Sequence, residues 1–281
     1  MAVRTSYTNV LLARRSILYV ILVIVAVYFL LPIYMVVLTG LKPFAEVSIA
    51  NMWRLPRDPS LEAFGGALQR LAPNLINSFL LVIPATILSA LLGSINGYVF
   101  SKWKFKYANV VFALILFGMF IPYQSILIPL VEFLRSIGLY GRISGLIFTH
   151  VIYGIPITTL MFRNFYAEVP DQLLDAGFID GLGIYSTYYR VMLPLSKPAL
   201  TVVAIWQFTS IWNDFLFAVT ITQRPAVQPI TVALQNLAGS QVVEWNVQMA
   251  GAILAALPTL AIYIILGRYF IRGMMSGSVK G

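Results

Sequence analysis

Side chains of the types that perform chemistry are few in this sequence, and they do not form the combinations that catalysis needs. His150 is the single histidine, and the chain contains no cysteine with which it could hold a metal. There is no G-x-x-x-x-G-K-[ST] loop for nucleotide phosphates, no H-E-x-x-H and no G-x-S-x-G. We therefore predict no catalytic residue and no metal site, and we favour a packed, structural role for a histidine that lies in an apolar stretch without a companion.

Asp214 is the most unusual of the remaining polar residues, because it interrupts a long apolar stretch at 198–223. Counted from a helix start near Pro198, it lies about 16 residues, or roughly 24 Å, along a membrane-crossing helix and towards its far end. Two interpretations are open. Either Asp214 and its neighbour Asn213 line a path for a polar solute, with Asn213 able to bind sugar hydroxyls, or they are end residues that contact water or a nearby loop.

The elements that must position these residues are membrane helices. The chain has 281 residues, of which 59% are hydrophobic and only 10% are charged, and its mean hydropathy is +0.85. Soluble proteins carry about 25% charged residues. The formal charge of +9 comes without a block of basic residues interleaved with aromatics, so it indicates membrane topology rather than nucleic-acid binding.

Six stretches reach the roughly 20 apolar residues that a bilayer-crossing helix requires. The first follows Arg14 and Arg15 and is long, with no clear A-x-A cleavage site, which favours a retained helix over a removed signal peptide. Gly93 and Gly97 form a G-x-x-x-G pair of the kind that lets membrane helices approach closely. We expect an all-α polytopic membrane protein with six transmembrane helices at 16–41, 71–101, 107–131, 143–162, 198–223 and 245–267.

The distribution of lysine and arginine predicts the orientation of the six helices. Twelve of these residues lie in the segments 1–15, 102–106, 163–197 and 268–281, and seven lie in the alternate set of segments. Because cytoplasmic loops carry the excess of basic residues, both termini and the 163–197 segment should be cytoplasmic. The external segments are then 42–72, 132–142 and 224–246, of which the first either folds against an external partner or is an ordinary connecting loop.

The 163–197 segment is a polar interruption that is too long for a tight turn and too short for a domain. Pro170 suits the first position of a helix, where Asp171 would lie at the positive end of the dipole. Gly181 can adopt the left-handed conformation that ends a helix, and a second helical piece at 184–193 should be stopped by Pro194. We predict a helix-turn-helix.

The first of these two helices should present different faces. Asp171 and Asp175 lie one turn apart on one face. A second face is apolar, and exposing it to water would require a partner. At helical spacing this apolar face contains Leu173, Leu174, Gly177 and Phe178.

The sequence D-A-G-F-I-D-G at 175–181, followed by V-M-L-P at 191–194, resembles the EAA motif of membrane permeases of bacterial and archaeal ABC importers. Asp175 stands where the family has Glu, and Gly177 stands where it has the second Ala. The sequence W-N-D-F-L-F at 212–217 and the tail at 268–281 are similar to the carbohydrate-importing branch, specifically the maltose-type second permease. The resemblance extends from about residue 70 to the end of the chain.

This resemblance implies that the cytoplasmic segment is a coupling helix that docks in a cleft of an ATP-binding subunit. It also implies that the C-terminal tail reaches between the ATP-binding subunits, although a flexible basic end remains an alternative. The implied contact residues are Leu173, Leu174, Asp175, Ala176, Gly177, Phe178, Asp180 and Gly181 in the segment, and Ser278, Val279, Lys280 and Gly281 in the tail.

The function expected from the resemblance is that of a permease subunit in an ATP-driven, binding-protein-dependent sugar importer of the bacterial or archaeal cell membrane. Its partners would be a second permease, most naturally a different chain, an external solute-binding protein and two ATP-binding subunits that carry ATP and Mg, with no cofactor on this chain. The expected regions are an N-terminus at 1–15, a permease domain at 16–270 with the coupling loop at 163–197, and a tail at 271–281. Alternatives are an ABC importer for a non-sugar solute and a proton-coupled carrier that uses Asp214.

Overall fold

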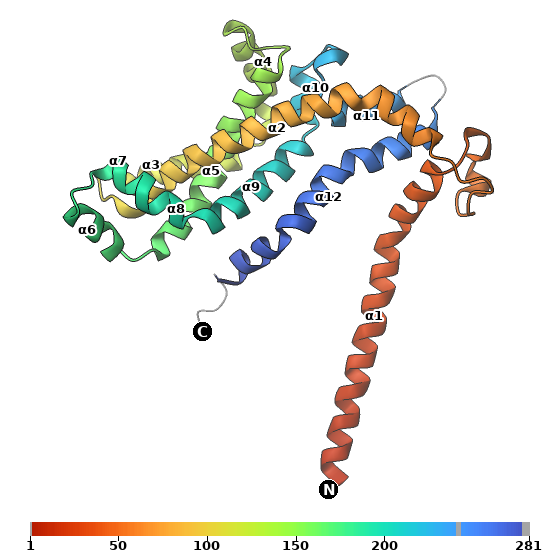
Figure 1. The fold of residues 1–281 in the computed structure, drawn as a ribbon, viewed down its shortest axis with the longest axis horizontal. Coiled ribbons are helices and arrows are strands. Elements are labelled where there is room, and N and C mark those ends of the chain that lie inside the picture. The colour runs from red at the N-terminus through yellow and green to blue at the C-terminus, as the bar shows by residue number, and fades with distance from the viewer. Residues whose placement is uncertain (1, 240–242, 277–281) are drawn as a thin grey trace. The chain divides into compact units, whose positions relative to one another are not determined.

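A computed structural model describes the backbone of residues 2–239 and 243–276, and the side chains of 14–239 and 243–267. The described chain is helical and has no strand (Figure 1). Its contacts divide it into two compact units, of which unit 1 comprises Met1–Arg70 and Leu237–Leu254, and unit 2 comprises Leu71–Asn236 and Ala255–Gly281. The predicted all-α membrane fold is confirmed.

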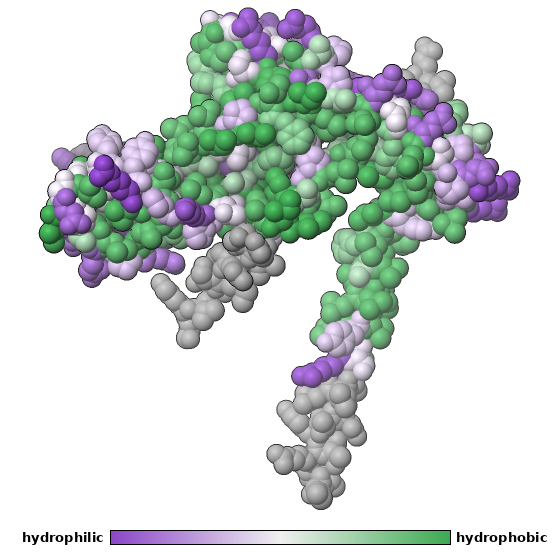
Figure 2. All heavy atoms as spheres, viewed as in Figure 1, coloured by the Kyte–Doolittle hydropathy of each residue, from purple (hydrophilic) through white to green (hydrophobic). Residues whose placement is uncertain are grey.

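Unit 1 contains α1 (Ala2–Gly40), the short turns η1 (Phe44–Glu46) and η2 (Ile49–Asn51), and the first turns of α2 (Glu62–Lys102) and α12 (Trp245–Ser276). Its small core is built from alanines of α2 and α12, because small side chains let helices approach closely. By contrast, residues 14–34 of α1 are all exposed, and Figure 2 shows an apolar surface along most of this helix. The exposed length of α1 suits contact with lipid.

Unit 2 contains the remaining turns of α2 and α12 and the elements between them, except the last two residues of α11. Its longest helix besides these is α5 (Ile143–Glu168). The other elements are α3 (Ala108–Phe117), η3 (Gly118–Phe120), η4 (Tyr123–Ile126), α4 (Leu127–Ser136), α6 (Gln172–Ile179), α7 (Ile184–Thr187), the π-helical turn η5 (Tyr188–Met192), α8 (Leu193–Leu195), α9 (Lys197–Trp212), α10 (Leu216–Ile221), η6 (Pro225–Val227) and α11 (Ile230–Ala238).

The structure has as many candidate membrane-crossing helices as the sequence predicts if each pair of helices joined by a sharp bend is counted as one. Four described helices are long and apolar enough to cross a membrane, and two bent pairs raise the number to six. One pair bends by 91° between Ala108–Phe120 and Tyr123–Ser136, where the predicted third helix was continuous. The other pair bends by 76° between Ile184–Leu195 and Lys197–Trp212, so its first half lies in the predicted 163–197 loop. The predicted fifth helix is interrupted, because α9 ends at Trp212 and α10 begins at Leu216.

The G-x-x-x-G pair of α2 packs against α5 within this chain. A Cβ at Gly93 would lie 2.5 Å from Cβ of Thr158, and a Cβ at Gly97 would lie 2.5 Å from Cβ of Phe162. Carbon atoms of neighbouring residues do not approach so closely, so glycine is what allows the two helix backbones to meet. The close-packing role predicted for this pair is confirmed.

Candidate functional site

The helix α6 ends in a Schellman motif. Gly181 has a φ of +79°, the left-handed conformation that glycine adopts without steric cost. The amide of Leu182 donates to the carbonyl of Gly177 at 2.9 Å, and the amide of Gly181 donates to the carbonyl of Phe178 at 3.0 Å. These two hydrogen bonds satisfy carbonyls that would otherwise be unpaired at the helix end. The predicted role of Gly181 is confirmed.

The start of α6 is held by Lys102, the last residue of α2. The Lys102 ammonium group donates hydrogen bonds to the carbonyl oxygen of Val169 and, at 2.7 Å, to Oδ1 of Asp171. The hydrogen bond and the positive charge of Lys102 lower the pKa of Asp171 below its ordinary value. The Lys102 side chain is buried while Asp171 is exposed. The N-terminus of α6 is therefore hydrogen-bonded directly to the end of the membrane helix α2.

One face of α6 is anchored in an aromatic cluster of unit 2. Leu174 is buried there among Tyr98, Tyr166 and Tyr188, which come from α2, α5 and η5. Hydroxyl groups link the same elements, because Tyr188 donates to Ser94 Oγ at 3.0 Å and Ser94 Oγ lies 2.7 Å from the Tyr166 hydroxyl. Packed side chains and hydroxyl groups therefore connect α6 with the helices α2 and α5.

The opposite face of α6 differs from the face expected from the sequence. Leu174 is only 6% exposed and Gly177 is also buried, so the placement of these two residues on an exposed face is wrong. Phe178 is 38% exposed, and its ring contacts Trp103 edge-on. We call the other exposed side chains of α6 and its C-cap the outer face of α6; they are those of Gln172, Leu173, Asp175, Ala176, Ile179 and Asp180.

Two apolar residues of this surface were not identified from the sequence. Ile179 is 86% exposed and Tyr185 is 81% exposed. Ile179 lies three residues after Ala176 and six after Leu173, a spacing that places all three on one side of a helix. This spacing was the signal available in the sequence. In Figure 2, polar and apolar residues are interspersed at the α6–α7 end of unit 2.

Both prolines of the 163–197 loop lie differently from the predictions. Pro170 precedes α6, which begins at Gln172 with Asp171 as its N-cap residue. Pro194 does not stop the second helix, since α7, η5 and α8 continue without a break to Leu195. The π-helical turn η5 ends at Met192, two residues before Pro194. Pro194 itself lies in the first turn of α8, a position at which the missing N–H of a proline is tolerated.

Asp214 and His150 lie together in unit 2, although the sequence gave the histidine no companion. Nε2 of His150 lies 3.5 Å from Oδ2 of Asp214, without a hydrogen bond. The same carboxylate accepts hydrogen bonds from the amides of Phe217 and Ala218, at 3.4 and 3.1 Å. Asp214 therefore caps the start of α10. The neighbouring Asn213 donates its side-chain amide to Thr209 of its own helix at 2.9 Å.

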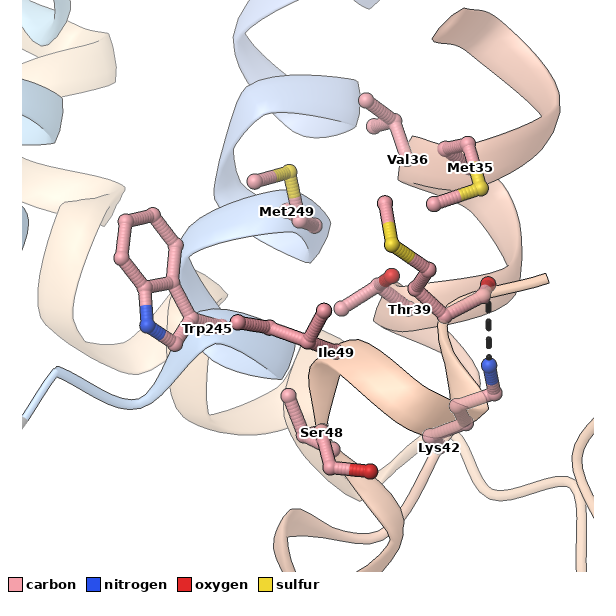
Figure 3. Close-up of a pocket in the computed structure, with 10 residues that line it drawn as sticks. Met35, Val36, Thr39, Lys42, Ser48, Ile49, Trp245 and Met249 are labelled. Atoms are coloured by element: carbon pink, nitrogen blue, oxygen red, sulfur yellow. Dashed lines mark hydrogen bonds between the residues drawn. The ribbon is translucent and has the colours of Figure 1, made fainter. Parts of the chain in front are cut away.

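Unit 1 holds a separate pocket of about 410 Å³ between the end of α1 and the start of α12 (Figure 3). Ile49 lines it beside Trp245 and Met249, so the cavity is mostly apolar. Lys42 lies at its edge and donates to the carbonyl of Asn51 at 2.8 Å, and desolvation lowers the pKa of this lysine. Contact of segment 42–72 with an external partner stays a prediction.

The tail residues Ser278, Val279, Lys280 and Gly281 lie outside the described residues. Within 2–239 and 243–276, no group of three or more metal-ligating side chains could hold a metal ion. What the described residues present is a set of helices that are long and apolar enough to cross a membrane, and one polar loop that is braced from within and carries both apolar and acidic side chains on its outer face. This is the architecture of a multi-pass membrane protein.

The chain belongs to the family of binding-protein-dependent transport system inner membrane components, whose model matches residues 85–276. It is similar to a probable ABC transporter permease protein of Pyrococcus horikoshii, at 47% identity over 95% of this chain and 98% of the relative. A xylose/arabinose import permease protein of Haloferax volcanii is 34% identical over 93% of this chain and 92% of the relative. This protein is therefore a permease subunit of an ABC importer.

A solved structure has the same fold. A chain of a bacterial ABC transporter involved in the import of the acidic polysaccharide alginate superimposes with a TM-score of 0.78 and 21% identity, over 90% of this chain and 94% of that chain. The permease family predicted from the EAA-like motif is confirmed.

Proposed function

We propose that this permease is part of an ATP-driven, binding-protein-dependent sugar importer and forms half of its translocation path. Two named proteins support carbohydrate as the solute class, the xylose/arabinose import permease and the alginate transporter. A second permease, most naturally a different chain, would supply the other half of the path. An external solute-binding protein would deliver the sugar.

The outer face of α6 is the observation that carries the coupling mechanism. An isoleucine that is 86% exposed, next to the exposed acids Asp175 and Asp180, fits a groove with apolar walls and a basic rim. We assign this groove to an ATP-binding subunit, one for each of the two permeases, and ATP and Mg to those subunits. Closure of the pair on ATP would push α6, and the Leu174 anchor would pass the movement to α2 and α5.

Leu174 and Gly177 take part in this proposal as supports of α6 rather than as contact residues, since both are buried. Phe178 supports the helix from its edge through Trp103. The tail residues are proposed to reach between the ATP-binding subunits. The tail residues that the family resemblance implies as contacts of the ATP-binding subunits are Ser278, Val279, Lys280 and Gly281.

The proposed topology places this permease in the bacterial or archaeal cell membrane with both termini in the cytoplasm. The excess of basic residues in the same set of segments as the 163–197 loop supports this orientation. The domain at 16–270 would then carry the path, with the coupling loop on its cytoplasmic side and the short ends at 1–15 and 271–281 beside that loop. A proton-coupled carrier is not favoured, because the Asp214 carboxylate is engaged in capping α10.

The test is uptake of radiolabelled xylose and arabinose into proteoliposomes that contain the complete complex and its binding protein. Ile179→Asp puts a charge into the proposed apolar groove, so we expect ATP-driven uptake and copurification of the ATP-binding subunits to fall about tenfold. Because Ile179 is exposed, the fold of the permease should be retained.

Asn164→Asp is the matched control, since it adds the same charge to an exposed residue of α5 outside the outer face of α6. It should leave uptake and subunit assembly unchanged. Normal coupling in the Ile179→Asp complex would contradict the docking proposal. A complex that hydrolyses ATP in response to its loaded binding protein but takes up neither sugar would point to a different solute.

A further inference from the structure

Unit 2 contains a cavity of about 200 Å³ between the middle of α5 and the second half of α9. Its lining combines aromatic rings with hydrogen-bonding groups and includes no carboxylate, lysine or arginine side chain. Six residues carry the argument below, namely His150, Tyr153 and Gly154 from α5 and Trp206, Gln207 and Ser210 from α9.

The α9 wall of this cavity continues as a stripe of exposed polar groups. Trp206, Ser210 and Asn213 follow one another at spacings of four and three residues, so they lie on one face of the helix, and all three are exposed. Trp206 is 48% exposed, and within the described part of the chain neither its indole N–H nor the Ser210 hydroxyl has a hydrogen-bond partner. Polar groups that face hydrocarbon without a partner are costly, so this polar stripe should face a water-filled space.

The α5 wall provides a buried nitrogen atom that makes no hydrogen bond, although it lies 3.5 Å from Oδ2 of Asp214. The His150 side chain is only 8% exposed, and its Nε2 makes no hydrogen bond. Buried nitrogen atoms of this kind are nearly always satisfied by protein, water or a ligand. His150 lines the cavity, so a hydroxyl group in the cavity is placed to satisfy it.

The cavity wall is fixed in position by close packing. The side-chain amide of Gln207 donates to Ser89 Oγ at 2.8 Å and lies directly against Gly154. A Cβ at Gly154 would collide with this amide and would lie 3.1 Å from Cβ of Ser89. Glycine therefore lets α9 approach α5, and the polar groups around it are held without needing to reorganise.

We propose that this cavity and the polar stripe of α9 form the sugar-contacting wall that this permease contributes to the translocation path, an assignment that rests on the proposed function. The Trp206 ring would stack on the apolar C–H face of a sugar ring, while the Ser210 hydroxyl and His150 Nε2 would bind sugar hydroxyls. Aromatic surface with a few convergent, uncharged polar groups is the chemistry of a neutral polyol site. Of the two residues singled out from the sequence, Asn213 belongs to the stripe, and Asp214 orients α10 behind it.

The first experiment asks whether the stripe faces water. The chain has no cysteine, so single-cysteine variants can be labelled cleanly once the other subunits are also free of cysteine. We expect a membrane-impermeant thiol reagent to modify W206C and S210C at least tenfold faster than I152C, which lies exposed on another face of α5. Equal rates for the three variants would overturn the proposal.

The second experiment separates sugar passage from coupling. Trp206→Ala should lower the xylose uptake rate about tenfold, the size expected when one good contact is lost, while ATP hydrolysis stimulated by the xylose-loaded binding protein stays within about twofold. Trp206→Phe should restore most of the uptake, and Ile152→Ala should change neither rate.

The outcomes distinguish this assignment from the proposed function. Uptake by Trp206→Ala that equals the wild-type rate, in a complex that transports xylose, overturns the cavity assignment alone. A parallel loss of uptake and ATP hydrolysis also overturns it, because that result identifies Trp206 as a structural residue. A wild-type complex that transports neither xylose nor arabinose overturns the proposed function together with the assignment.

Discussion

The outer face of α6 and the polar stripe of α9 each expose side chains that do not suit the surroundings in which we place them. On α6, apolar side chains such as Ile179 face the aqueous side. On α9, an indole N–H and a hydroxyl lie on the exposed face of a membrane helix. The mismatch has opposite sign in the two regions, which is why we proposed a protein groove as the partner of one region and a hydrated path beside the other.

The two regions also differ in what holds them. The helix α6 is short and depends on its ends, on Lys102 at the start and the Schellman motif at Gly181. The helix α9 depends on close contact with α5 around Gly154. Substitutions at these supports should therefore break one region without the other.

Gly181→Val should have the largest effect. A β-branched residue in the left-handed conformation costs at least about 1–2 kcal/mol, and the hydrogen bonds of Leu182 and Gly181 would be lost with it. We expect uptake to fall tenfold or more, about the size of that energy, while unit 2 keeps its helices. Gly181→Asn is the control, because Asn tolerates this conformation. Normal uptake with valine would contradict the dependence of α6 on its C-terminal cap.

Gly154→Ala and Gly177→Ala form a matched pair with opposite expected signs. At Gly154 the added methyl group meets the Gln207 amide, and overpacking of this kind costs about 1–3 kcal/mol. At Gly177 the nearest side-chain atoms, of Leu182 and Thr187, would lie 3.6 Å from the new Cβ, which is ordinary contact distance. Alanine there should stabilise α6 by about 0.5–1 kcal/mol.

Thermal unfolding of the purified permease in detergent measures both members of the pair. The midpoint should fall for Gly154→Ala and rise slightly for Gly177→Ala, which also restores the residue typical of the EAA motif. If the unfolding midpoint shifted in the same direction for both variants, the proposed difference in packing between Gly154 and Gly177 would be wrong.

Asp171→Asn should have the smallest effect, and a specific pH dependence. The pKa of Asp171 is lowered in the folded chain, so its ion pair stabilises the fold above the ordinary pKa of 3.8 and is lost as the pH falls through the lower, folded value. The difference in unfolding midpoint between wild type and Asp171→Asn should be constant from about pH 5 to 8 and should shrink only in stronger acid. A difference that disappears near neutral pH would exclude this ion pair as its cause.

The sequence predicted those features that depend on local composition. Long apolar runs located the membrane helices, and the need for a left-handed residue located the end of α6 at Gly181. The buried face of α6 could not be chosen in this way, because Leu173 and Leu174 are adjacent and equally apolar. The choice is made by the tyrosines of α2 and α5, which are distant in sequence.

The continuous helix through Pro194 has a physical explanation that was not visible in the sequence. A proline breaks a helix by lacking an N–H and by clashing with the preceding turn. The π-helical turn Tyr188–Met192 shifts the hydrogen-bond register before Pro194, because the amide of Leu193 donates to the carbonyl of Tyr188, five residues earlier. Similarly, His150 and Asp214 meet only because α5 lies against the start of α10.

The exposure of α1 has a consequence for how this part of the chain tolerates mutation. Because residues 14–33 are all exposed, we expect exchanges among leucine, isoleucine, valine and phenylalanine there to create no cavity and cause no collision within this chain. For this stretch, length and apolarity should therefore matter more than the identity of each side chain.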